Sequence, residues 1–126
     1  MAVATVKGWG RLGGYRVEFA RKDDRVRSAA AVYESVAGAT SALAAEGADA
    51  ARGLRRAPAP PVLLGQQTVL YASPGSGPTA KLEWALVWRD HGVVAVLYSR
   101  GLRVGALVEL AHIQEARISL AIRRNA

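Results

Sequence analysis

The chain has 126 residues, a formal net charge of +7 and no cysteine. This length allows one domain with a sizeable core, and the 51% of hydrophobic residues excludes a disordered tail. The lack of cysteine excludes disulfides, thiolate metal sites and thiol nucleophiles, and no apolar run approaches the roughly 18 residues that a membrane-spanning helix needs.

The first third of the sequence predicts an irregular N-terminal segment followed by a β-hairpin. Residues 8–14 contain four glycines, so we expect residues 1–14 to be irregular. Residues 15–21 alternate between apolar and charged side chains, which is typical of a half-buried strand. A turn at residues 22–24 and a second strand at residues 26–33 complete the hairpin.

A helix is predicted over residues 36–53. Ser35 is a suitable N-cap, and apolar residues then follow at three- and four-residue steps. Gly38 and Gly47 weaken the helix but allow it to lie close to a sheet. The prolines within residues 57–61 cannot continue a helix and predict an extended connector.

The second half predicts three strands and a closing helix. The strands cover residues 68–73, 82–89 and 93–99, with a turn at residues 90–92, and the helix covers residues 104–124. Ile113, Leu120 and Ile122 widen the apolar stripe of this helix. The fold class is therefore α+β, a single domain over residues 15–126. Its antiparallel sheet of about five strands, in the order β-β-α-β-β-β-α, is backed on one face by two helices.

The strand at residues 93–98 is apolar on both of its faces. If both helices cover one face, the other face forms an open apolar patch, which usually indicates an interface or a ligand surface. A two-residue turn would place Val87 opposite Val96, and a three-residue turn would place it opposite Ala95. A homodimer, another protein, a small apolar ligand or the N-terminal segment with Trp9 would cover the patch. The predicted patch residues are Ala85, Val87, Val94, Val96 and Tyr98.

Two polar residues interrupt the closing helix near its apolar stripe. Gln114 and Arg117 need hydrogen-bond partners if they are buried. They either bridge to a strand carbonyl or to Glu18, or they line a pocket between the helix and the sheet. We include both residues in the candidate binding site.

The sequence predicts no catalytic residue, no metal and no cofactor. Glycines near residues 8–13 and 75–77 lack the strand and helix context or the spacing of nucleotide-binding loops. His91 lies in a turn, and His112 lies beside Glu109, which gives too few ligands for a metal. No pair of carboxylates stands in an apolar setting. Nucleic acid is not an expected partner: the net charge is the one feature in favour of it, and two acidic residues interrupt the basic residues 21–27.

The order of these features resembles a group of small secreted or lipoprotein-borne α+β domains of Gram-positive bacteria. The segments that carry the resemblance are residues 15–19, 33–35, 64–67, 86–94 and 111–118. The chain also distantly resembles the extracellular sensor domains of actinobacterial Ser/Thr kinases, although those domains usually carry disulfides.

This resemblance implies an extracellular or envelope location after removal of a signal segment. Residues 1–6 lack signal-peptide features, so the other location that we consider is the cytoplasm. We therefore expect a non-enzymatic domain that binds a ligand or a protein at the cell envelope. The alternative is a small cytosolic enzyme or binding protein that dimerises through its sheet and has a pocket between helix and sheet.

Overall fold

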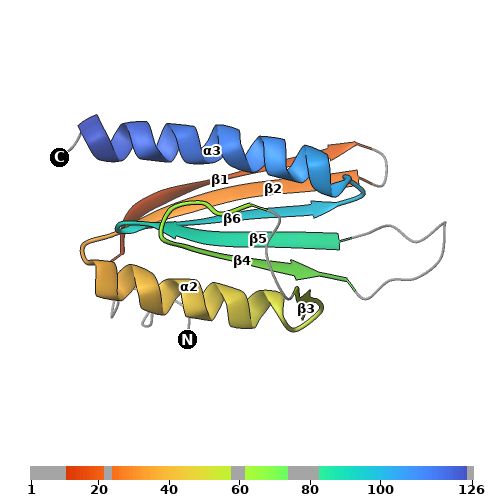
Figure 1. Ribbon diagram of the computed structural model, residues 1–126, viewed down its shortest axis with the longest axis horizontal. Coiled ribbons are helices and arrows are strands. Elements are labelled where there is room, and N and C mark those ends of the chain that lie inside the picture. Colours follow the sequence, from red (N-terminus) through yellow and green to blue (C-terminus); the bar gives the residue numbers. More distant parts are fainter. Residues whose placement is uncertain (1–10, 22–23, 58–61, 74–82, 125–126) are drawn as a thin grey trace.

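The computed structural model describes residues 11–21, 24–57, 62–73 and 83–124 (Figure 1). The chain begins with the hairpin β1 (Arg11–Arg21) and β2 (Asp24–Tyr33), and α2 (Val36–Ala50) follows. The strands β3 (Arg55–Arg56), β4 (Gln67–Ala72), β5 (Glu83–Asp90) and β6 (Val93–Arg100) lead to α3 (Val104–Arg124).

The described strands form one antiparallel sheet in the order β1-β2-β6-β5-β4-β3. The predicted α+β class and antiparallel sheet are confirmed, with six strands where about five were expected. The additional strand is β3, whose two residues pair with the end of β4. Two residues are too few to show a periodic pattern, so the sequence alone does not reveal this strand.

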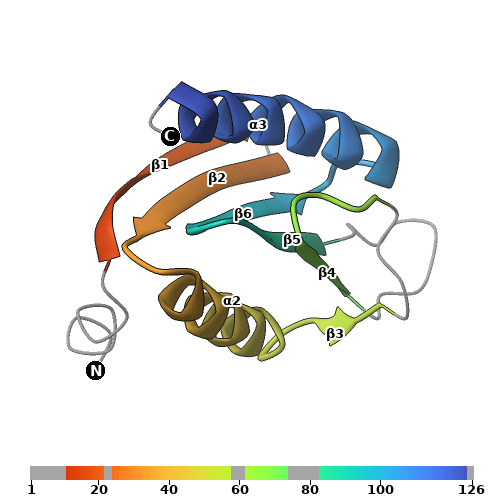
Figure 2. The same ribbon diagram turned by 60° about the vertical axis from the view of Figure 1, so that its left-hand side comes forward.

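The described helices α2 and α3 lie on opposite faces of the sheet, and the prediction that two helices back one face is wrong (Figures 1 and 2). Leu107, Ala111 and Ile118 of α3 pack into one core with Leu86 and Trp88. A second core joins α2 to the other face of the sheet; its members include Ala39, Ala42, Leu43, Val87 and Val94. The molecule therefore has three layers, with the sheet in the middle.

Strand β5 shows why both faces need a helix. Trp88 is fully buried and Trp84 partly buried on the side of α3, while Ala85 and Val87 are buried on the side of α2. The β5–β6 turn has two residues and places Val87 opposite Val96, as the shorter of the two predicted turns requires. Because side chains alternate along a strand, apolar residues at every position require cover on both sides.

Local features of α2 match the sequence pattern. The Ser35 hydroxyl accepts a hydrogen bond from the Gly38 N–H at 3.0 Å and so caps the first turn. Gly47 faces the Tyr71 ring on the sheet, and a Cβ atom there would collide with the Tyr71 hydroxyl. The glycine therefore permits the close approach that its position predicted.

Strand β1 begins at Arg11, four residues before the predicted start. The predicted irregular segment is therefore wrong for residues 11–14, which pair with the end of β2. Residues 1–10 of that segment, Trp9 among them, lie outside the described residues. Within the described ranges, neither helix is long and apolar enough to cross a membrane.

The burial of the sheet face under α2 predicts how the protein responds to a charge introduced there. Val87 is 1% exposed, so Val87→Glu buries an unpaired carboxylate and should lower the free energy of unfolding by at least about 3 kcal/mol. Val32→Glu is the matched control, because Val32 is 42% exposed in the same sheet and its substitution should change stability by less than about 1 kcal/mol. Urea denaturation followed by circular dichroism measures both effects. Wild-type stability of Val87→Glu would contradict the position of α2.

Candidate functional site

An apolar groove lies between α3 and the outer strands of the sheet. Its volume is about 660 Å³, which is within the range of small-molecule sites. Strands β1, β2 and β6 form one wall, and the second half of α3 forms the other. The residues that line it are Gly14, Tyr15, Val17, Val26, Ser28, Ala30, Val32, Val93, Leu97, Leu110, Ile113, Gln114, Arg117, Ile118 and Ala121.

The groove forms because α3 covers the centre of the sheet better than its edge. The core under α3 contains residues of β2, β5 and β6, but no described residue of β1. Tyr15 and Val17 of β1 are 46% and 41% exposed, and Ile113 on the facing side of α3 is 53% exposed. These apolar side chains lie on the two walls of the groove without closing it.

Among the described residues that line the groove, Gln114 is the one buried polar side chain. It is 6% exposed, and its Nε2 donates a hydrogen bond of 3.1 Å to the Ala29 carbonyl of β2. Its Oε1 is buried and has no partner among the described residues. Both sequence interpretations of Gln114 therefore apply, because it bridges to a strand carbonyl and lines a pocket.

Arg117 lies one turn after Ile113 on α3 and also lines the groove. Arg117 is exposed, and it makes no hydrogen bond or ion pair with the sheet among the described residues, so the predicted bridge to a strand carbonyl or to Glu18 is not formed. The guanidinium adds a positive charge to an otherwise apolar lining. Gln114 and Arg117 thus line the same groove.

The other predicted site residues lie on the opposite face of the sheet, and the open patch they were expected to form does not exist. Ala85, Val87 and Val94 are buried in the core under α2. Val96 and Tyr98 are partly buried beside them, at two smaller cavities of about 530 and 180 Å³. Arg27, Glu46 and Asp49 also line both cavities and make them polar.

Tyr98 is held by polar contacts and is not free for an apolar partner. Its hydroxyl donates a hydrogen bond of 2.7 Å to Glu83, and the Arg27 guanidinium lies 5.3 Å from its ring centroid. Burial and the hydrogen bond to Glu83 raise the pKa of Tyr98 above its usual value. The tyrosine therefore joins three strands through its ring and hydroxyl.

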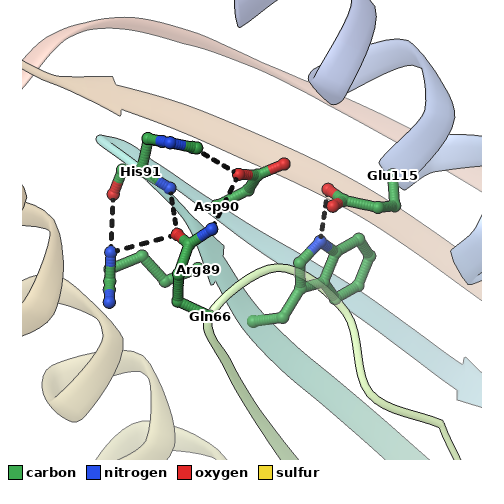
Figure 3. A network of polar contacts seen from close by, with 6 residues as sticks. Gln66, Arg89, Asp90, His91 and Glu115 are labelled. Atoms are coloured by element: carbon green, nitrogen blue, oxygen red, sulfur yellow. Dashed lines mark hydrogen bonds and ion pairs between the residues drawn. The ribbon is translucent and has the colours of Figure 1, made fainter.

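A second cluster of polar side chains gathers at the β5–β6 turn (Figure 3). Arg89 is 9% exposed, and its guanidinium donates to the side chains of Gln66 and Gln67 and to the His91 carbonyl. The Gln66 side chain in turn accepts from the His91 N–H and donates to Asp90. These bonds hold the turn at residues 65–67 against the end of the hairpin.

Two backbone positions make this arrangement possible. Gly65 has φ of 57°, and a Cβ atom there would collide with the Arg89 carbonyl of β5. His91 also adopts a positive φ, of 52°, in the two-residue turn, a conformation that is uncommon for residues other than glycine. Its ring nitrogen Nδ1 lies 2.7 Å from the Asp90 carboxylate, which adds a local contact to the strained residue.

Asp90 and Glu115 form a pair of carboxyl groups between the turn and α3, which the sequence did not predict. Burial opposes the charge of Asp90, but hydrogen bonds with His91, Glu115 and Gln66 outweigh burial and lower its pKa. Burial and the neighbouring Asp90 raise the pKa of Glu115 to about 7, although the Trp88 indole donates to it at 3.2 Å. Between the lowered pKa of Asp90 and about pH 7, the pair therefore holds one proton on Glu115 and one negative charge on Asp90.

None of the three described cavities reaches the Asp90–Glu115 pair. The groove and the two smaller cavities are lined by other residues, so none of them brings a substrate to the pair. The predicted neighbours Glu109 and His112 lie exposed on α3. Among the described residues, no three His, Asp or Glu side chains are arranged to hold a metal.

Sequence reasoning missed the apolar side chains that form the groove. Tyr15 and Val17 were placed on a half-buried strand, and the wall residues Val32, Leu110 and Ile113 were not singled out as a site. One signal was present in the pattern, because the apolar stripe of the last helix is wider than a helix on a small sheet can bury. A surplus of apolar side chains on a helix indicates either a larger core or an exposed surface.

The carboxyl pair makes stability depend on pH. The pKa of Glu115 is higher in the folded protein than in the unfolded chain, so its contribution is present below the unfolded value of 4.5 and is lost as the pH rises through about 7. The melting temperature should therefore fall between about pH 5 and about pH 8. Since Glu115 is partly exposed, solvent screening limits the effect to about 1 kcal/mol, or about 3–6 °C.

Glu115→Gln tests this pH dependence, because an amide can still accept from Trp88 and donate to Asp90 without ionising. Its melting temperature should vary less over the same pH range, as measured by differential scanning calorimetry. Glu109→Gln removes an exposed carboxylate from the same helix and should keep the wild-type dependence. Equal slopes in wild type and Glu115→Gln would mean that Glu115 does not hold the proton.

Comparison with protein-family models, with curated proteins and with solved structures gives no match for this chain. The function therefore has to be inferred from the geometry of the groove and of the sheet.

Proposed function

We propose that this protein is a non-enzymatic binding domain that takes a small, elongated apolar molecule into the groove between α3 and strands β1 and β2. The observation that carries the proposal is the groove itself, with a volume of about 660 Å³ and a lining that is almost entirely apolar. A small domain gains by removing such a surface from water. A ligand in the groove would cover Tyr15, Val17 and Ile113 together.

Gln114 gives the proposed ligand one polar requirement. Its Oε1 is an acceptor that the described residues leave unpaired. Leaving a buried acceptor without a hydrogen bond costs about 1–3 kcal/mol of free energy. A ligand with a hydroxyl or N–H group would supply the missing bond after a small rotation of the side chain. We therefore expect an apolar molecule with a hydrogen-bond donor near its middle.

The positive charge of the chain and the exposed Arg117 at the groove favour neutral or anionic ligands over cationic ones. The resemblance to secreted and lipoprotein-borne domains supports an extension of the proposal to the cell envelope. The alternative of an enzyme has weaker support, because the only carboxyl pair described lies away from the groove.

Binding can be measured with N-phenyl-1-naphthylamine, a neutral apolar probe that carries one N–H group and fluoresces in apolar surroundings. The wild type should bind it with enhanced emission. Ile113→Glu places a charge on the groove wall and should raise the dissociation constant at least about tenfold. The new carboxylate is four residues before Arg117 on the helix, so the fold should be retained.

Leu63→Glu is the matched control, because Leu63 is 81% exposed and lies outside the groove. Its dissociation constant should equal that of the wild type. The N-methylated probe tests Gln114, because it lacks the N–H group and should bind about tenfold more weakly to the wild type. Gln114→Leu should bind both probes equally. Saturable binding that Ile113→Glu leaves unchanged would refute the groove as the site.

A further inference from the structure

The two edges of the sheet are protected very differently. One edge is β3, which is two residues long and consists of two exposed arginines. The other edge is β1, which has eleven residues and no strand neighbour on its outer side among the described residues. Short, charged strands resist pairing with another chain, whereas long strands with exposed apolar side chains favour it. Strand β1 is therefore the edge from which association is expected.

The charges of β1 are arranged so that the strand is complementary to itself. Arg16 and Glu18 are exposed on the face opposite Tyr15 and Val17, and they stand on either side of Val17. When two copies pair antiparallel about a two-fold axis perpendicular to the sheet, each residue lies opposite the residue equally far from the axis. With the axis at Val17, Arg16 lies opposite Glu18 of the partner subunit.

Neighbouring registers lack this complementarity. An axis at Arg16 places the two Arg16 residues opposite each other, and an axis at Glu18 does the same for the two Glu18 residues. Like charges directly opposite each other in a sheet are destabilising, whereas unlike charges stabilise the pair. If the pairing shifted by one residue, each residue would lie opposite a partner residue whose side chain points to the other face of the sheet. A two-fold axis perpendicular to the sheet excludes this pairing. The charge pattern thus selects the register about Val17.

We propose that two copies of this chain form a homodimer by antiparallel pairing of their β1 strands about Val17, which joins the two sheets into one. This dimer replaces the expected association through the sheet face, which α2 covers. The two-fold axis places both α3 helices on the same side of the joined sheet. Tyr15 and Val17 of both copies then lie together, so the two apolar grooves meet at the interface.

Tyr15 and Val17 belong both to the edge strand β1 and to the groove, and the dimer accounts for this double position. In one copy, Tyr15 and Val17 are the outermost wall of the groove and remain half exposed. In the dimer, the partner subunit's Val17 lies directly opposite and closes that wall. The dimer does not depend on the proposed ligand, so the oligomeric state and probe binding can be tested separately.

A charge exchange tests the pairing, with sedimentation velocity of the full chain at micromolar concentration as the readout. The wild type should be a dimer. Glu18→Arg and Arg16→Glu each place like charges opposite one another twice and should raise the dissociation constant at least about tenfold. The double variant with both changes restores unlike pairs in the same register and should recover the dimer. Circular dichroism checks that each variant is folded.

A single cysteine gives an independent test, because the chain has none of its own. Val17→Cys places two thiols directly opposite each other across the axis, at a spacing that a disulfide can span. Mild oxidation should convert this variant to a covalent dimer. Arg16→Cys is the matched control, because its two thiols would lie two rungs apart and should crosslink slowly.

A monomeric wild type would overturn the proposal. A dimer that persists in Glu18→Arg, or that crosslinks equally at positions 16 and 17, would place the interface elsewhere and would overturn it too. Loss of probe binding alone leaves the dimer standing, since that result contradicts only the proposed ligand site. Loss of the dimer with retained probe binding contradicts only the β1 pairing.

Discussion

The central constraint on this structure is that the hairpin of β5 and β6 is apolar on both faces. Trp88 and Leu86 point to one side, and Val87 and Ala85 point to the other, all of them nearly inaccessible to water. If either face were left uncovered, its apolar side chains would be exposed to water. Each face therefore requires its own helix. The described part of the chain contains two helices, and one of them lies on each face (Figure 2).

The unequal cover of the sheet follows from this division. Each helix packs on the central strands, where burial of apolar side chains removes the most surface from water. On its own face of the sheet, α3 packs on the central strands, and the described part of β1 extends beyond the surface that α3 covers. The apolar groove and the unpaired edge at Tyr15 and Val17 are therefore two results of the same shortage of cover. A ligand and a second copy of the chain would each cover part of the remaining surface.

The polar cluster at the β5–β6 turn has a different part in the fold. Arg89 and Asp90 are buried at the end of β5, next to the turns at residues 65–67 and 91–92. The polar groups of these turns need hydrogen-bond partners, which apolar side chains cannot provide. Their hydrogen bonds join the two turns, and Glu115 connects both to α3 through Trp88 and Asp90. Because Glu115 holds its proton up to about pH 7, this attachment of α3 weakens as the pH rises above neutral.

Elements whose signals are local were predictable from the sequence. The Ser35 cap, the alternation of β5 and the turn between β5 and β6 each depend on neighbouring residues, and the structure has them at or near the predicted positions; the sequence left the length of the turn open. The β1 start at Arg11 was missed because the glycines there suggest a loop, whereas pairing with β2 keeps them extended. Strand β3 is too short to produce any pattern.

The sequence by itself determined which residues share a face of each strand, because side chains alternate along an extended chain. It also placed Gln114 and Arg117 at the boundary between helix and sheet. Only the tertiary structure decided which face each helix takes, since alternation does not distinguish the two sides of a sheet. The same holds for the Asp90–Glu115 pair, whose members are 25 residues apart, and for the groove, whose walls come from both ends of the chain. Contacts between such distant segments depend on the packing of the layers, and no local periodicity encodes them.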